Sequence, residues 1–120
     1  MRIGFVTVHV EDLERAIAFW QEVMGFAIAR RFQAGPKVEI AFLDDGGGHR
    51  LELIAGTGQT VRGEGFSVGF DVEDMDATLA HLKKHGVAIV FGPQTMQSGV
   101  RLLQAEDVNG LDLVFVQNPR

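Results

Sequence analysis

Glu52 is the residue of this sequence whose type and setting point most clearly to chemistry. It lies between two leucines in the alternating stretch RLEL at 50–53, a pattern typical of a β-strand with one apolar face. A carboxylate among apolar neighbours could orient a cationic or hydroxyl-bearing ligand, or act as a base if burial raised its pKa. A structural role is the alternative, in which Glu52 pairs with Arg50 or Arg101.

Histidines and serines offer weaker chemistry. His81 and His85 have a metal-compatible i and i+4 spacing on an expected helix. However, the glutamate of an HExxH motif is absent and two lysines intervene, so a solvated helix face is the better interpretation. His49 follows three glycines, and we expect it to be exposed in a turn. Ser67 has no histidine spaced to act as its base.

Missing residue types and net charge narrow the functional classes. The chain has no Cys and no Tyr, which excludes disulfides, thiol nucleophiles, cysteine-bound zinc and a Tyr general acid. Its formal charge of −5 opposes binding to phosphate backbones. No apolar run approaches the length of a membrane span. We therefore expect a cytoplasmic protein with no nucleic-acid or membrane partner.

An internal repeat sets the expected organisation. Three segments recur about sixty residues later: VEDLE at 10–14 as VEDMD at 72–76, GFAI at 25–28 as GVAI at 86–89, and GHRLEL at 48–53 as GLDLVF at 110–115. The repeat predicts one domain of 120 residues built from two modules. Module 1 is expected at 1–58 and module 2 at 65–120, with a glycine-rich linker at 59–64.

Each module is expected to run strand, helix and three further strands. Residues 3–10 alternate in polarity, which places Phe5, Thr7 and His9 on one face and three valines on the other. Ser67 lies in the equivalent first strand of module 2. The remaining strands are predicted at 26–33, 37–43, 50–55, 87–91, 100–105 and 111–116.

One helix follows the first strand of each module. Asp12 and Asp74 are the predicted N-caps, and Gly25 and Gly86 end the helices as C-terminal glycines do. A single helix covers only one face of a sheet, so the other face needs a partner. Two such sheets side by side would form a curved, half-barrel mixed sheet with the helices outside. The predicted class is therefore α+β, with a concave surface that suits a ligand.

Several short motifs lie in register across the duplicated chain: VEDL at 10–13, FW at 19–20, MGF at 24–26 and DVNG at 107–110. Together they resemble the vicinal-oxygen-chelate superfamily, also called the glyoxalase/bleomycin resistance protein/dioxygenase fold. The resemblance covers essentially the whole chain. It implies paired βαβββ modules and a homodimer, with modules exchanged between chains in some relatives. In metal-dependent relatives, four residues, mostly His and Glu, bind a divalent ion.

The resemblance implies four metal-ligand positions in this sequence: Phe5, Glu52, Ser67 and Val114. Phe and Val cannot coordinate a divalent cation, and a Ser hydroxyl is a poor substitute for imidazole. A site made from His9 and Glu52 would have only two ligands, which is short of a catalytic set. We therefore expect no metal and no other cofactor, and the metal-dependent activities of the family are disfavoured.

Two functional hypotheses follow, beside the alternative of a dimeric module whose cavity has no retained role. The first is a metal-free protein that binds a small molecule in the concave cavity of a homodimer, as the resemblance to the bleomycin-resistance branch implies. The second is a lyase- or isomerase-like enzyme that uses Glu52, with His9 or Arg50, to move a proton on a small carbonyl compound. We expect a cavity poor in catalytic groups and in large aromatic side chains, which favours binding. Its expected lining is Phe5, Thr7, His9, Arg50, Glu52, Ser67, Arg101 and Val114.

Overall fold

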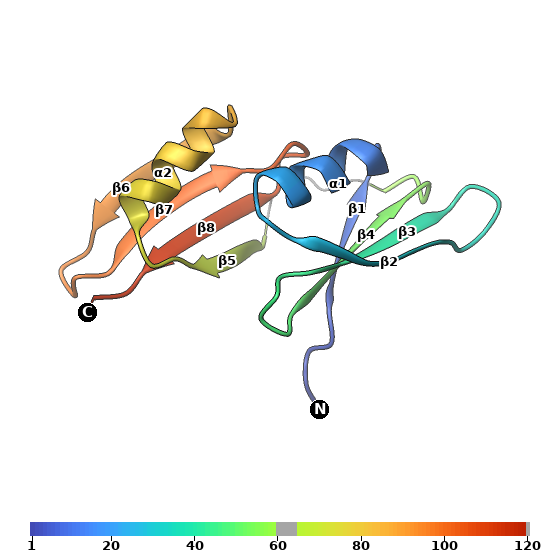
Figure 1. Ribbon diagram of the computed structural model, residues 1–120, viewed down its shortest axis with the longest axis horizontal. Coiled ribbons are helices and arrows are strands. Elements are labelled where there is room, and N and C mark those ends of the chain that lie inside the picture. Colours follow the sequence, from blue (N-terminus) through green and yellow to red (C-terminus); the bar gives the residue numbers. More distant parts are fainter. Residues whose placement is uncertain (60–64, 120) are drawn as a thin grey trace. The chain divides into compact units, whose positions relative to one another are not determined.

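The computed structural model describes residues 1–59 and 65–119. The chain forms two compact units, and the boundary between them falls within 60–64. Most of the predicted linker, 59–64, therefore lies outside the described residues. Unit 1 contains β1 (Val6–Val10), α1 (Leu13–Glu22), β2 (Ala27–Gln33), β3 (Glu39–Asp44) and β4 (Arg50–Ala55). Unit 2 contains β5 (Ser67–Asp71), α2 (Met75–Lys84), β6 (Ala88–Thr95), β7 (Arg101–Glu106) and β8 (Asp112–Gln117) (Figure 1).

The two units have the same topology. Unit 1 has the strand order β1-β4-β3-β2 and unit 2 has the order β5-β8-β7-β6. The first and last strands of each unit pair in parallel, and the other neighbours are antiparallel. The predicted α+β class and the two βαβββ modules are thus confirmed. The half-barrel stays a prediction.

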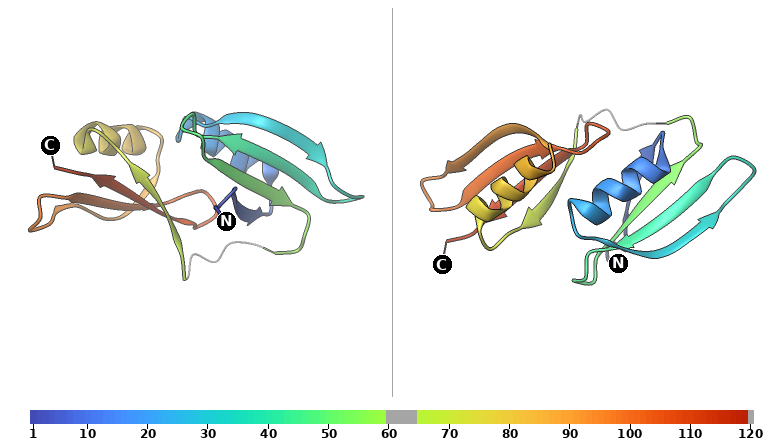
Figure 2. Two further views of the ribbon diagram at one scale, coloured as in Figure 1. Left: turned by 90° about the horizontal axis from the view of Figure 1, so that it is seen from below. Right: turned by 45° about the horizontal axis from the view of Figure 1, so that its top comes forward.

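In each unit one helix lies across one face of the sheet (Figure 2). In unit 1 the alternation expected along the strands is confirmed, because Val8, Leu43 and Leu53 are buried on the side of the sheet that α1 covers. The apolar side of α1 faces them with Leu13, Ile17 and Trp20, all buried. Unit 2 is built in the same way: Met75 and Leu82 of α2 and Leu103, Leu113 and Phe115 of the sheet are all buried. Burial of apolar area of this kind is the main favourable term in folding.

Helix boundaries follow the predicted caps. The side chains of Asp12 and Asp74 each accept the backbone N–H three residues on, at 3.1 and 3.0 Å. Gly25 and Gly86, just beyond the helices, have φ of +75° and +69°, a conformation that costs glycine nothing and strains other residues. Neither helix in the described part of the chain has the length and apolarity to cross a membrane.

Two strand boundaries differ from the predicted ones by three residues or more, and the others agree within two residues. β1 begins at Val6 rather than at residue 3, because its pairing with β4 starts at Val6; residues 1–5 continue past the strand (Figure 1). β6 continues past residue 91 to Thr95, although it contains Pro93. Proline lacks the N–H that a central strand needs, but β6 is an edge strand, where proline is tolerated.

Replacing Asp74 with Ala removes the side-chain acceptor that caps α2. The free energy of unfolding should fall by about 1 kcal/mol, as measured by urea denaturation followed by circular dichroism. Glu73→Ala, at the exposed position just before the cap, is the matched control and should change stability by less than about 0.5 kcal/mol. Equal losses in the two variants would contradict the capping role.

Candidate functional site

Most of the predicted site residues lie on one surface of unit 1. We call the face of its sheet that α1 does not cover the open face of unit 1. Thr7 and His9 reach it from β1, with Phe5 just before that strand, and Arg50 and Glu52 reach it from β4. These positions alternate with residues buried under the helix, and the parallel register pairs Thr7 directly with Glu52.

The carboxylate of Glu52 is held by its neighbour on β1. The Thr7 hydroxyl donates to Oε1 of Glu52 at 2.6 Å, and both residues are half-buried. The alternative of an ion pair with Arg50 or Arg101 is not among the described contacts of Glu52. The Thr7 hydroxyl takes Oε1 and fixes the direction of the carboxylate. Among the described residues no donor is assigned to Oε2, which can therefore accept a further hydrogen bond.

Arg101 lies on the other side of its sheet from Val114. It shares a face with Leu103 and Ala105, which are buried on the helix-covered side of unit 2. Its guanidinium pairs with Asp76 of α2 at 3.2 Å. Arg101 therefore has a structural ion pair and does not share a surface with Val114.

The other two predicted residues belong to unit 2. Ser67 and Val114 lie on the face of its sheet that α2 does not cover, since their neighbours Leu113 and Phe115 are buried on the opposite side. Val114 pairs with Gly69, at the register position where Glu52 pairs with Thr7. The repeat thus keeps the backbone pairing while the polar pair of unit 1 is replaced by apolar residues.

His9 and the other histidines form separate local contacts. Nδ1 of His9 is 3.0 Å from the Thr57 hydroxyl, in the loop after β4. His81 of α2 and His85, which follows the end of α2, are exposed, with ring centroids 4.6 Å apart. His49 is exposed in its turn, as predicted, with 84% of its side chain accessible.

An aromatic cluster, formed by Phe5, Phe42 and Phe32, crosses the open face of unit 1. The rings of Phe5 and Phe42 meet edge to face, with centroids 5.4 Å apart. Those of Phe42 and Phe32 stack at 6.4 Å, and the guanidinium of Arg30 lies 4.4 Å above Phe32. The expectation of a surface poor in large aromatic side chains is therefore wrong for this unit. The alternation along 39–44 places Phe42 beside Glu52 and was the signal available in the sequence.

Asp107 is a buried carboxyl that the sequence did not single out as a site residue. It is 7% exposed, and its Oδ1 accepts the N–H groups of Asn109 and Leu111, both at 2.8 Å. Burial raises the pKa of Asp107 despite these donors. A perturbed carboxyl is a candidate for function, but both hydrogen bonds close the turn between β7 and β8, so the role is structural.

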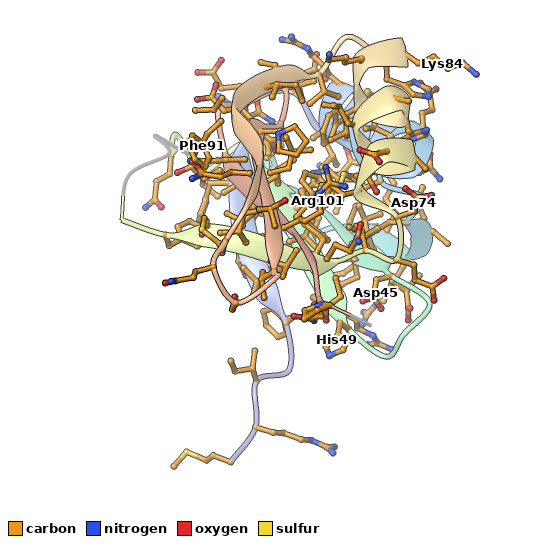
Figure 3. The ribbon with its side chains drawn as sticks, turned by 90° about the vertical axis from the view of Figure 1, so that its left-hand side faces the viewer. Asp45, His49, Asp74, Lys84, Phe91 and Arg101 are labelled. Carbon is orange, nitrogen blue, oxygen red and sulfur yellow. The ribbon has the colours of Figure 1, made fainter. Side chains whose placement is uncertain are left out.

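Asp45 occupies the same place in unit 1 with a different environment. It accepts N–H groups of Gly47 and His49 at 2.7 and 3.0 Å, and Oδ2 lies 3.2 Å from Nδ1 of His49 (Figure 3). Although burial acts to raise it, these backbone donors and the His49 ring hold the pKa of Asp45 below its ordinary value. The pKa values of the two equivalent carboxyl groups in the duplicated turn are therefore shifted in opposite directions, down for Asp45 and up for Asp107.

Comparison with known proteins identifies the family. The model of the Glyoxalase/Bleomycin resistance protein/Dioxygenase superfamily matches residues 2–115. The chain is 31% identical over 115 residues to the uncharacterized protein YetH of Bacillus subtilis (strain 168), covering 91% of this chain and 92% of YetH. A glyoxalase family protein from Bacillus cereus has a TM-score of 0.82 at 26% identity, covering 98% of this chain and 93% of that one. TnmS3, an antibiotic binding protein from Streptomyces sp. CB03234, has a TM-score of 0.82 at 24% identity, with 99% and 97% covered. The chain belongs to the glyoxalase/bleomycin resistance protein/dioxygenase superfamily, as its sequence predicts.

The metal that some members of this superfamily bind does not fit the residues present. Of the four implied positions, Glu52 has a ligand side chain, and Phe5 instead packs its ring against Phe42. Phenylalanine and valine offer no donor atom, and one carboxylate with one serine hydroxyl is too few for a divalent ion. Across residues 1–59 and 65–119, no three His, Asp or Glu side chains lie close enough together to hold a metal.

Replacing Asp107 or Asp45 with Asn should change the pH dependence of stability in opposite directions. A raised pKa means that folded Asp107 holds its proton more tightly. Its contribution to stability is therefore complete below the ordinary carboxyl pKa of about 4 and is lost as pH rises through the raised value. A lowered pKa means that the contribution of Asp45 is present above about pH 4 and is lost as pH falls.

Urea unfolding between about pH 3 and about pH 7 measures both effects, because asparagine does not titrate. On acidification the wild type should gain stability relative to Asp107→Asn and lose stability relative to Asp45→Asn. Parallel stability curves for the wild type and Asp107→Asn would contradict the burial-driven shift.

Proposed function

We propose that the chain is a metal-free small-molecule-binding protein of the glyoxalase/bleomycin-resistance type, which holds its ligand on the open face of unit 1 within a homodimer. The aromatic cluster is the observation that carries the proposal. Phe5 is 50% exposed, and Phe42 and Phe32 are half-buried beside it. The helix of unit 1 does not cover these stacked and edge-to-face rings. Their faces can therefore contact the flat apolar part of a ligand.

Glu52 supplies the polar recognition in this proposal. Its carboxylate lies directly across from Phe42 in the β3–β4 register, and Thr7 orients it through Oε1. A ligand ammonium or hydroxyl resting on the rings would find Oε2 as its acceptor. Either donor would form a hydrogen bond strengthened by the carboxylate charge, and an ammonium group would add the attraction between opposite charges, so a cationic ligand is favoured.

The hydrogen bonds on the open face favour binding over the enzyme hypothesis. Proton transfer by Glu52 was expected to involve His9 or Arg50. The His9 ring forms a hydrogen bond with the Thr57 hydroxyl, and the Glu52 carboxylate accepts one from the Thr7 hydroxyl. The two groups therefore have different hydrogen-bond partners. The fold alone does not decide between binding and catalysis, since one fold carries many functions. The likeness to TnmS3, an antibiotic binding protein, is compatible with the proposal.

We also propose that the chain forms a homodimer and is located in the cytoplasm. Met1, Ile3 and Val6 are exposed apolar residues at and before the edge strand β1. Exposed apolar side chains beside a strand edge suit contact with a second copy of the chain. The lack of cysteine suits the reducing cytoplasm.

Glu52→Gln should weaken cationic ligands selectively. A thermal-shift screen of cationic antibiotics and aromatic amines should yield hits, whose affinities are then measured by calorimetry. Because the variant keeps the shape and removes the charge, affinity should fall by about 10- to 100-fold. Glu22→Gln, on the exposed side of α1, is the matched control and should bind like the wild type. A screen without hits, or equal binding by all three proteins, would contradict the proposal.

A further inference from the structure

A row of paired residues that includes Glu52 crosses the four strands on the open face of unit 1, and it holds two opposite charges. The strand registers pair Thr7 with Glu52, Glu52 with Phe42, and Phe42 with Arg30. Paired residues on neighbouring strands point to the same side of a sheet. The row therefore places a carboxylate on β4 and a guanidinium on β2, with the ring of Phe42 between them.

The separation of the two charges follows from the geometry of the sheet. Neighbouring strands lie about 4.8 Å apart, so two strand spacings place the backbones of Glu52 and Arg30 about 10 Å apart. The stacked rings of Phe42 and Phe32 form an apolar surface between Glu52 and Arg30. A ligand lying on these rings would meet a negative charge at one end and a positive charge at the other.

Arg30 differs from the arginine next to it. Arg31 forms ion pairs with Glu14 and with Glu39, and the charge on Arg31 is thereby balanced within the unit. Among the described residues no carboxylate pairs with Arg30, which lies instead over the ring of Phe32. A guanidinium stacked on an aromatic ring keeps the N–H donors at its edge available.

Arg50 also reaches the open face of unit 1 but has a different setting. Its cross-strand neighbour is Asp44, whose negative charge offsets it, whereas the cross-strand neighbour of Arg30 is Phe42. Arg50 is also two residues from Glu52 on the same strand, at the same end of the row. Arg30 is thus the cation on the open face that is placed opposite Glu52 across the aromatic cluster.

We infer that the ligand is an amphoteric aromatic molecule, with an ammonium group bound by Glu52 and a carboxylate or similar anion bound by Arg30. The inference rests on the proposed function and adds the second charge and its position. A planar guanidinium recognises a carboxylate through two parallel N–H donors. Arg30 is therefore the residue that distinguishes a zwitterion from a simple aromatic amine.

Three biphenyl probes test the inference on the full chain by calorimetry: para-aminomethylbiphenyl, biphenyl para-carboxylate, and the zwitterion that carries one of these groups at each end. The zwitterion should bind at least about tenfold more tightly than the amine, since it gains a charged hydrogen-bonded pair. Arg30→Gln should remove this preference, so that the variant binds the zwitterion and the amine with affinities within about twofold of each other. Arg15→Gln, on the exposed side of α1, is the matched control and should keep the preference.

The outcomes separate the two proposals. If the amine and the zwitterion bind equally to the wild type, or if Arg50→Gln rather than Arg30→Gln removes the preference, the role of Arg30 is overturned while binding at Glu52 stands. If none of the three probes binds, the amphoteric site is overturned. The proposed function then fails as well only if the wider amine and antibiotic screen also yields no hit.

Discussion

A four-stranded sheet with one helix has one buried face, and this constraint underlies the whole structure. Apolar side chains fill the helix-covered side of each sheet, so every second residue of each strand must face the other way. In unit 1 those positions hold Glu52, Thr7 and three phenylalanines. The packing that stabilises the unit thus also fixes which residues can form a site.

Duplication has produced two units with one backbone plan and different surfaces. Thr7 with Glu52 in unit 1 corresponds to Gly69 with Val114 in unit 2. The matching turns show the same divergence, with the pKa of Asp45 lowered and that of Asp107 raised. The two units therefore share their strand register but differ in the side chains that the register places on the open faces.

The periodic features of the fold were predictable from the sequence, whereas contacts between distant strands were not. The caps at Asp12 and Asp74 and the alternation around Glu52 are local signals, and the structure bears them out. The aromatic cluster depends on the pairing of β2 with β3, which shifts register between Ile28 and Arg30, and a shift of that kind leaves no local pattern. Arg101 was predicted on the wrong face because Leu102 and Leu103 are both apolar, so the alternation along this strand does not show which face the helix covers.

The central claim is that a small aromatic cation binds on the open face of unit 1, and chemical-shift mapping of the isotope-labelled full chain with para-aminomethylbiphenyl tests it most directly. The account predicts that the largest changes fall on Thr7, Phe42 and Glu52, which share one row of the sheet. It also predicts little change on the exposed side of α1. Largest changes on either helix, or on unit 2 alone, would contradict it.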